Sequence, residues 1–197
     1  MRKLIHLAMA ILPAVGWWLS YLLALALATV LVGASLIVEA ARRWWPWLNR
    51  LLWRLLPTVF RESEDRRLLG STWFAVGAAA SFFLFGPDTG GTAVLLLCWG
   101  DPAAEIVGRK WGRAGQGKTA VGSLGCLLAC AVAGLVGVGL GGLSPWTALA
   151  GAVAATLVER WPPPPNDNLW MPVLSGLAMA ATEWLVGGET VLLPLWR

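Results

Sequence analysis

The chain has 197 residues, of which 57% are hydrophobic and only 13% are charged, and its formal net charge is +4. Soluble domains usually carry about 25% charged residues, so this composition offers too little polar surface for a water-soluble globule. Long apolar runs predict a polytopic membrane protein instead, because a spanning helix needs roughly 20 apolar residues.

Seven apolar segments follow one another, and we expect about seven transmembrane helices in an all-α fold. The segments are Leu4–Gly16, Leu19–Ala41, Leu69–Phe85, Gly91–Gly108, Ala120–Leu140, Trp146–Glu159 and Leu169–Val186. The first one imitates a signal peptide, but apolar sequence continues to Ala41, which indicates two retained helices. We expect a single transmembrane domain over residues 1–197.

The stretch "RRWWPWLNRLLWRLLP" joins the second and third segments. Trp and Leu alternate with Arg at roughly helical spacing, which favours an amphipathic helix lying in the cytoplasmic interface of the membrane. A simple connector with a tryptophan belt is the alternative.

Lysine and arginine occur in alternate loops. They are Arg2, Lys3, Arg42, Arg43, Arg50, Arg54, Arg61, Arg66, Arg67, Arg109, Lys110, Arg113, Lys118 and Arg160, with Arg197 left over. Seven crossings place all but Arg197 on one side of the membrane. The positive-inside rule therefore predicts a protein integral to the cell membrane, with a cytoplasmic N-terminus and an outside C-terminus. This topology explains the net charge without a nucleic-acid partner.

The stretch Gly112–Thr119, "GRAGQGKT", satisfies the G-x-x-x-x-G-K-[ST] pattern of P-loop nucleotide-binding proteins. A P-loop follows a buried strand in an α/β domain. Here the loop follows "LLLCWGDPAAEIVGRKW", whose two acids and proline do not suit a central strand. These features argue against a P-loop fold, but Lys118 and Thr119 at the start of a helix still favour phosphate binding, because helix N-termini attract anions.

The fourth segment contains two acids, Asp101 and Glu105, one helical turn apart. Acids in membrane segments are expensive unless paired, and like charges at this spacing repel. A shared Mg²⁺, a shared proton or basic neighbours such as Arg109 would relieve the repulsion. Gly108 and Gly112 allow either close approach of a ligand or close helix packing.

A second polar cluster, "VERWPPPPNDNLWMP", falls on the same predicted side. It contains Glu159, Asp167 and Asn168, for which helix-end and turn chemistry is the alternative explanation. His6 in the first segment is the single histidine of the chain, with either a structural or a catalytic role.

In these residues the chain resembles the polyprenol kinase family, which includes dolichol kinases, phytol kinases and CTP-dependent diacylglycerol kinases and is related to CDP-diacylglycerol synthases. Five patterns carry the resemblance in order. They are "RK..H" at Arg2, Lys3 and His6; "E..R" at Glu39 and Arg42; "GD..A..GR..G" at Gly100, Asp101, Ala104, Gly108, Arg109 and Gly112; "K[ST]..GS" at Lys118, Thr119, Gly122 and Ser123; and "E…DN…P" at Glu159, Asp167, Asn168 and Pro172. Val121 departs from many relatives, which carry an acid or alanine there.

The resemblance implies a catalytic domain that transfers the γ-phosphoryl group of a nucleoside triphosphate, CTP in this family, to a membrane lipid alcohol such as a polyprenol, phytol or diacylglycerol. Asp101, with Asp167, would hold Mg²⁺ or another divalent cation. The base that accepts the hydroxyl proton is left open among Glu105, Glu159 and His6. The residues expected to hold nucleotide are Gly108, Arg109, Gly112, Lys118, Thr119, Gly122, Ser123 and Asn168.

Two alternatives remain. A CTP:phosphatidate cytidylyltransferase-like CDP-lipid synthase would use the same donor and metal, although the acidic C-terminal signature of those enzymes is absent. A non-catalytic transporter or scaffold could use buried acids to carry ions, but here the polar residues gather at one face of the membrane rather than at its midplane.

Overall fold

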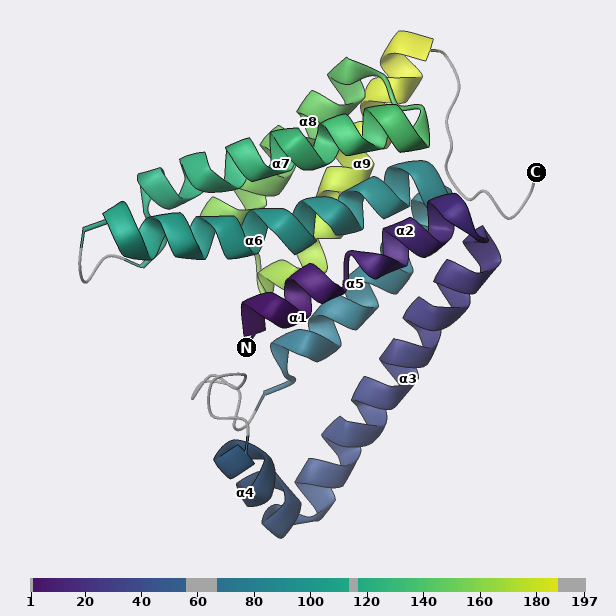
Figure 1. The fold of residues 1–197 in the computed structure, drawn as a ribbon. Helices are drawn as coiled ribbons and strands as arrows, with labels where there is room; N and C mark the ends of the chain where they lie inside the picture. Colours follow the sequence, from purple (N-terminus) through teal and green to yellow (C-terminus); the bar gives the residue numbers. More distant parts are fainter. Residues whose placement is uncertain (1, 56–66, 114–116, 188–197) are drawn as a thin grey trace.

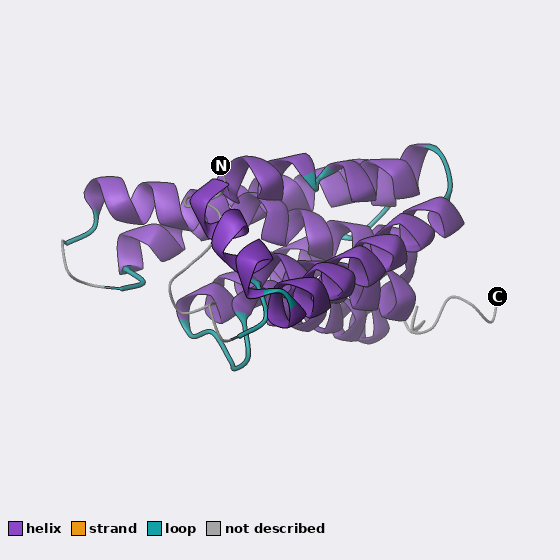
Figure 2. Ribbon diagram, turned by 90° about the horizontal axis from the view of Figure 1, so that it is seen from below, coloured by secondary structure: helices purple, strands orange, loops and turns teal. Residues whose placement is uncertain are grey.

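The fold is known from a computed structural model that describes residues 2–55, 67–113 and 117–187. All regular elements in these ranges are helices, and none of the described residues forms a strand (Figure 2). The all-α prediction is confirmed. Parts of two predicted features lie outside the described ranges, namely the end of the Arg-Trp stretch beyond Leu55 and the middle of the Gly112–Thr119 loop.

The first predicted segment forms two short helices, α1 (Arg2–Ala8) and α2 (Ile11–Trp18). The break has a local cause: Pro13 has no N–H group to donate to the carbonyl of Met9, which instead accepts from Leu12 N at 3.0 Å. Next comes α3 (Tyr21–Trp44), whose first turn is capped by the Ser20 hydroxyl.

The short helix α4 (Pro46–Leu55) occupies most of the predicted interfacial stretch. One face of this helix carries an exposed hydrophobic residue at every fourth position, namely Trp47, Leu51 and Leu55. Arg50 and Arg54 lie outside this row of hydrophobic residues. The predicted amphipathic helix is therefore present, and its position in a membrane interface stays a prediction.

The third and fourth predicted segments are α5 (Gly70–Phe85) and α6 (Gly91–Trp111), joined by a single π-helical turn, η2 (Gly86–Gly90). Gly86 has φ 74°, a left-handed conformation that glycine adopts without strain. The two helices therefore run in different directions from this turn (Figure 1). Helix α6 continues three residues beyond the predicted end.

The last three helices are α7 (Ala120–Gly141), α8 (Pro145–Arg160) and α9 (Asp167–Gly187). Thr119 and Ser144 cap the first turns of α7 and α8 through their hydroxyl groups. Helix α9 begins at Asp167, two residues before the predicted start, so the polar Asn-Asp-Asn sequence enters the first turn of a helix.

Four helical stretches of the described residues are long and apolar enough to cross a membrane. They are Tyr21–Trp44, Gly70–Trp111, Ala120–Gly141 and Asp167–Val186, with Lys3–Trp18 as a shorter apolar helix. The second of these comprises α5, η2 and α6. The membrane character is thus supported, while this count does not reproduce the predicted seven spans.

Helices α6 to α9 pack together, α5 lies against α9, and α3 lies at the side against α5 (Figure 1). Fully buried side chains at the centre include Phe82, Leu96, Leu97, Met171 and Met179. Only 11% of the apolar window of α3 is buried, compared with 78% for the α5–α6 stretch. Helix α3 therefore presents most of its apolar surface outward.

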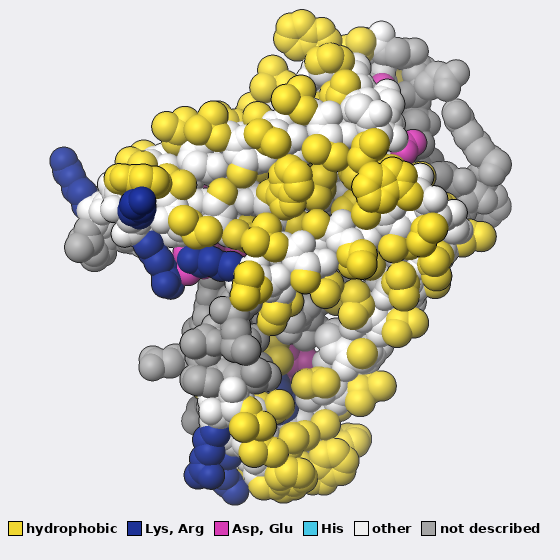
Figure 3. Space-filling view, viewed as in Figure 1, with side chains coloured by type: hydrophobic (Ala, Val, Ile, Leu, Met, Phe, Trp, Pro, Cys, Tyr) yellow, Lys and Arg dark blue, Asp and Glu magenta, His cyan; other side chains and the backbone are white. Residues whose placement is uncertain are grey.

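Basic side chains gather at one end of the molecule in the face that Figure 3 shows. They lie around the α6–α7 connection and on α4, whereas the long flanks of the helices are covered by hydrophobic side chains. This distribution agrees with the separation of basic loops that the sequence predicts.

Candidate active site

An ion-pair cluster joins the beginnings of α7 and α9 to the end of α8. Lys118 Nζ lies 2.8 Å from Asp167 Oδ2 and 3.4 Å from Glu159 Oε1. Both carboxylates are nearly inaccessible, with 9% and 7% of the side chain exposed, whereas Lys118 keeps 30% of its side chain exposed. Three residues from the two polar clusters of the sequence thus meet at one point.

The pKa of Lys118 is raised above its ordinary value. Burial by itself lowers this pKa, but attraction and a hydrogen bond from Asp167, together with attraction from Glu159 and Asp101, outweigh that effect. Lys118 therefore stays positively charged at neutral pH.

The first turn of α7 completes the surroundings of Lys118. Thr119 Oγ1 accepts a hydrogen bond from Gly122 N at 3.1 Å, and Ser123 Oγ donates a hydrogen bond to Glu159 Oε2 at 3.3 Å. The guanidinium of Arg160 donates to the carbonyl of Lys118. Thr119 is thus a helix cap, and Arg160, which the sequence treated only as a topology signal, fixes the backbone of the lysine.

Asn168 in the first turn of α9 is almost completely buried. Its Nδ2 donates to the Gly70 carbonyl at 2.8 Å, which ties α9 to the start of α5. Its Oδ1 is buried and has no hydrogen-bond partner. An unsatisfied buried carbonyl oxygen is an available ligand for a cation or a donor group.

His6 on α1 contacts Asp101 on α6. Its Nδ1 lies 3.3 Å from Asp101 Oδ2. The alignment does not satisfy hydrogen-bond geometry, so this contact is a close electrostatic approach, and Nδ1 has no hydrogen-bond partner although His6 is only 5% exposed. The two predicted catalytic residues from distant parts of the sequence are therefore neighbours.

Glu105 is not part of this arrangement. Its Oε1 lies 2.7 Å from Arg109 and 3.6 Å from Lys3, at a more accessible position. The side chain of Arg109 is 76% exposed. Basic neighbours therefore relieve the repulsion between the two acids of α6, one of the possibilities that the sequence left open.

The glycines of the predicted nucleotide site pack helices together. A Cβ atom on Gly122 would lie 2.8 Å from the Ala104 carbonyl, and one on Gly112 would lie 2.8 Å from Thr119 Cγ2. A Cβ atom on Gly108 would approach Thr119 Oγ1 to 3.1 Å. These positions need glycine because α6 and the start of α7 are in close contact.

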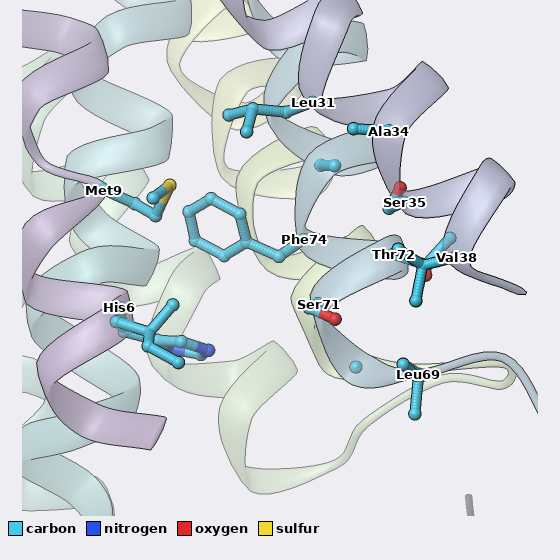
Figure 4. Close-up of a pocket in the computed structure, with 13 residues that line it drawn as sticks. His6, Met9, Leu31, Ala34, Ser35, Val38, Leu69, Ser71, Thr72 and Phe74 are labelled. Carbon is cyan, nitrogen blue, oxygen red and sulfur yellow. The ribbon is translucent and has the colours of Figure 1, made fainter. Parts of the chain in front are cut away.

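A pocket of about 290 Å³ lies between α1, α3 and α5 (Figure 4). Its lining is mainly apolar and includes Met9, Leu31 and Phe74, with His6 beside the Phe74 ring at a centroid distance of 5.3 Å. Sequence reasoning did not find this pocket, because its residues are ordinary members of apolar helices and carry no distinctive pattern.

A buried ion pair between Glu39 and Arg42 lies beside this pocket. Glu39 Oε2 accepts from Arg42 Nε at 2.8 Å, while Glu39 Oε1 accepts from Leu69 N at 2.5 Å and lies 3.3 Å from Thr72 Oγ1. Arg42 also donates to the Arg67 carbonyl. The "E..R" pattern thus joins the end of α3 to the beginning of α5.

Comparison with known proteins gives an independent result. The chain is 28% identical over 175 residues to CTP-dependent diacylglycerol kinase 1 of Saccharomyces cerevisiae, covering 74% of this chain and 59% of that protein. It is 31% identical over 150 residues to CTP-dependent diacylglycerol kinase 1 of Schizosaccharomyces pombe, covering 66% of this chain and 68% of the relative. The chain belongs to the polyprenol kinase family of lipid kinases.

A second type of polyprenol kinase family member also matches. The phytol kinase of Synechocystis sp. is 31% identical over 118 residues, covering 57% of this chain and 45% of that protein. No family model and no solved structure matches the chain. The resemblance read from five short patterns is therefore confirmed, although the chain spans only 59% of the length of the Saccharomyces relative.

Proposed function

We propose that this chain is a membrane-bound kinase that transfers the γ-phosphoryl group of CTP to the hydroxyl group of a lipid alcohol. The position of His6 carries the proposal. This side chain lines an apolar pocket and also approaches Asp101, so it connects a place for a hydrocarbon chain with a polar cluster suited to phosphates. CTP as donor is supported by the names of the yeast relatives.

The charges around Lys118 favour a divalent cation. A triphosphate would meet the carboxylates of Asp101, Glu159 and Asp167 and one lysine, so its negative charge needs further compensation. Within the described residues no three Asp, Glu, His or Cys side chains gather closely enough to hold a metal by themselves. Mg²⁺ in phosphoryl-transfer sites commonly uses one or two carboxylates plus substrate phosphates, and the residues here fit that requirement.

We assign Asp101 and Asp167 to the cation, with Asn168 Oδ1 as an available oxygen ligand. When bound, the cation would neutralise charge on the phosphates and orient them. Lys118 would exchange part of its contact with Asp167 for phosphate oxygens, while Arg160 holds its backbone in place.

His6 is the candidate of choice for the base that accepts the hydroxyl proton. Glu105 is engaged by Lys3 and Arg109, and Glu159 is engaged by Lys118 and Ser123. His6 lines the pocket, its Nδ1 makes no hydrogen bond although it lies 3.3 Å from Asp101 Oδ2, and imidazole is an effective general base near neutral pH. Asp101 would then stabilise the imidazolium that forms.

We further propose seven crossings of the cell membrane, with α1 and α2 together forming the first. Helices α3, α5, α6, α7, α8 and α9 would form the others, as one catalytic domain with its site at the cytoplasmic face. The gathering of basic side chains at the end that carries the α6–α7 connection supports this orientation (Figure 3).

The fate of labelled phosphate tests the function. We expect purified protein with Mg²⁺ to pass the label of [γ-³²P]CTP to phytol, a polyprenol or diacylglycerol in mixed micelles and to leave CDP. Label at the α position should remain water-soluble. Transfer of α-label to phosphatidate with release of pyrophosphate would identify a CDP-lipid synthase instead, and transfer of neither label to any lipid would contradict catalysis.

A further inference from the structure

The apolar pocket between α1, α3 and α5 has one polar end. The lining consists of Ile5, His6 and Met9 from α1 and the residue after it, of Leu31, Ala34, Ser35 and Val38 from α3, and of Leu69, Gly70, Ser71, Thr72, Phe74 and Ala75 from the start of α5. Figure 4 shows His6 and Leu69 toward one end and Met9 and Leu31 toward the other, with the Phe74 ring between them. The long axis of the pocket therefore runs along the helices, from His6 at one end to Leu31 at the other.

Two of the three hydroxyl groups in the lining are already engaged, and the third belongs to Ser71. Ser35 Oγ donates to the Val32 carbonyl at 2.9 Å, and Thr72 Oγ1 lies 3.3 Å from Glu39 Oε1. His6 Nδ1 makes no hydrogen bond and lies 3.3 Å from Asp101 Oδ2. A ligand in this pocket thus meets the His6 imidazole and the Ser71 hydroxyl toward one end and hydrocarbon over most of its length (Figure 4).

The rim of the pocket reaches the outer surface of the helices. Ile5 and Val38 are 40% and 41% exposed, and Ala34 is exposed as well. In a membrane protein such a rim on apolar helices faces hydrocarbon rather than water. The pocket is also small, at the lower end of the roughly 300–1,000 Å³ typical of ligand pockets.

We propose that this pocket binds one hydrocarbon chain of the acceptor alcohol, with the hydroxyl end at His6 and the chain running past Phe74 toward Met9 and Leu31. This inference rests on the proposed kinase function and names the place of its lipid substrate. A second chain, where the acceptor has one, stays in the bilayer. The side chains on the middle of α3 therefore determine which chains are accepted.

Two substitutions of the same kind on α3 separate this site from the general surface of the helix. Ala34→Phe places a ring in the pocket, whereas Ala26→Phe adds the same ring at an exposed position of α3 outside it. We expect Ala34→Phe to raise the KM for a single-chain alcohol about tenfold and to leave the KM for CTP unchanged. Ala26→Phe should change neither by more than about twofold.

A photoreactive probe gives a readout that does not depend on turnover. The probe is a long-chain alcohol with a diazirine in the chain and an alkyne for detection, added to the full-length protein in phosphatidylcholine nanodiscs. Mass spectrometry of the wild type should find label on peptides that contain Met9, Leu31 or Phe74. Ala34→Phe should reduce this labelling at least fivefold, and Ala26→Phe should not.

A third variant covers the case in which Ala34→Phe fails to fold. Leu31→Ala enlarges the pocket, and we expect it to improve kcat/KM for a methyl-branched alcohol relative to an unbranched one about fivefold. Equal labelling and kinetics in both alanine-to-phenylalanine variants, or label concentrated on α7 to α9, would overturn the pocket assignment while kinase activity stood. Absence of phosphate transfer in the wild type would instead refute the kinase proposal, and the label positions would still decide the pocket.

Discussion

Lys118 and Asp167 form an ion pair of 2.8 Å that joins the residue before the α7 cap to the first residue of α9. Forty-nine positions separate the two residues in the chain, yet their pairing brings the two polar clusters of the sequence into one place. Because 30% of the lysine side chain remains exposed, the proposed function lets it exchange the carboxylate for a phosphate oxygen of the nucleotide.

Replacing Lys118 by alanine should weaken the use of nucleotide strongly. A charge-assisted hydrogen bond contributes about 1.5–3 kcal/mol, so we expect kcat/KM for CTP to fall roughly 10- to 100-fold. Steady-state kinetics with varied CTP measures the effect. Arg113→Ala, an exposed basic residue of the same loop, should stay within about twofold of wild type. Equal values for both variants would reduce Lys118 to a topology signal.

The two acids of α6 should differ in their response to Mg²⁺. Asp101→Asn keeps the shape but removes a charge proposed to hold the cation, so we expect a large loss of activity that added Mg²⁺ partly restores. Glu105→Gln should be milder, because Glu105 pairs with Lys3 and Arg109 at an accessible site. Activity at several Mg²⁺ concentrations distinguishes them, and equal losses would place both carboxylates at the cation.

His6→Gln should lower kcat with little change in the KM for CTP. General base catalysis contributes typically 10²- to 10⁴-fold, so a decrease of at least about 100-fold is expected. Steady-state kinetics with varied CTP and varied lipid alcohol separates kcat from the two KM values. A kcat within about tenfold of the wild type would assign the proton transfer to another residue.

Glu39→Gln should destabilise the protein. Glu39 and Arg42 are each 3% exposed, and breaking a buried pair by removing one partner costs about 3–5 kcal/mol. Thermal unfolding in detergent should show a lower Tm. The double variant Glu39→Gln, Arg42→Met removes both charges and should recover part of the loss. A Glu39→Gln variant with wild-type Tm would contradict the role of this pair in holding α3 to α5.

Topology can be tested with reporters at two places. A reporter fused after Arg197 should lie outside the cytoplasm if the chain crosses the membrane seven times, and one inserted after Gly112 should lie inside. Alkaline phosphatase and green fluorescent protein give opposite signals on the two sides. A cytoplasmic reporter after Arg197 would show an even number of crossings.

The sequence predicted helix positions well because long apolar runs and the prolines and glycines between them are local features. The sequence also predicted Lys118, Glu159 and Asp167 as site residues, because each belongs to a short pattern that the chain shares with the polyprenol kinase family. It did not predict that Gly122 faces Ala104 or that His6 meets Asp101. Those contacts depend on how α1, α6 and α7 pack, and one amphipathic pattern is compatible with several packings.

Helix α3 is hydrogen-bonded to α5 and to the residue before it at positions near its two ends. Tyr21 Oη donates to the Phe82 carbonyl at 3.0 Å near one end, and Glu39 accepts from Leu69 N near the other. Four residues between these attachments, Leu31, Ala34, Ser35 and Val38, border the pocket, and α3 packs mainly against α5 and α2. On the proposed assignment, mutations at these four positions would change the accepted lipid and leave the CTP site intact, so that one scaffold could acquire new acceptor specificities through changes in a single helix.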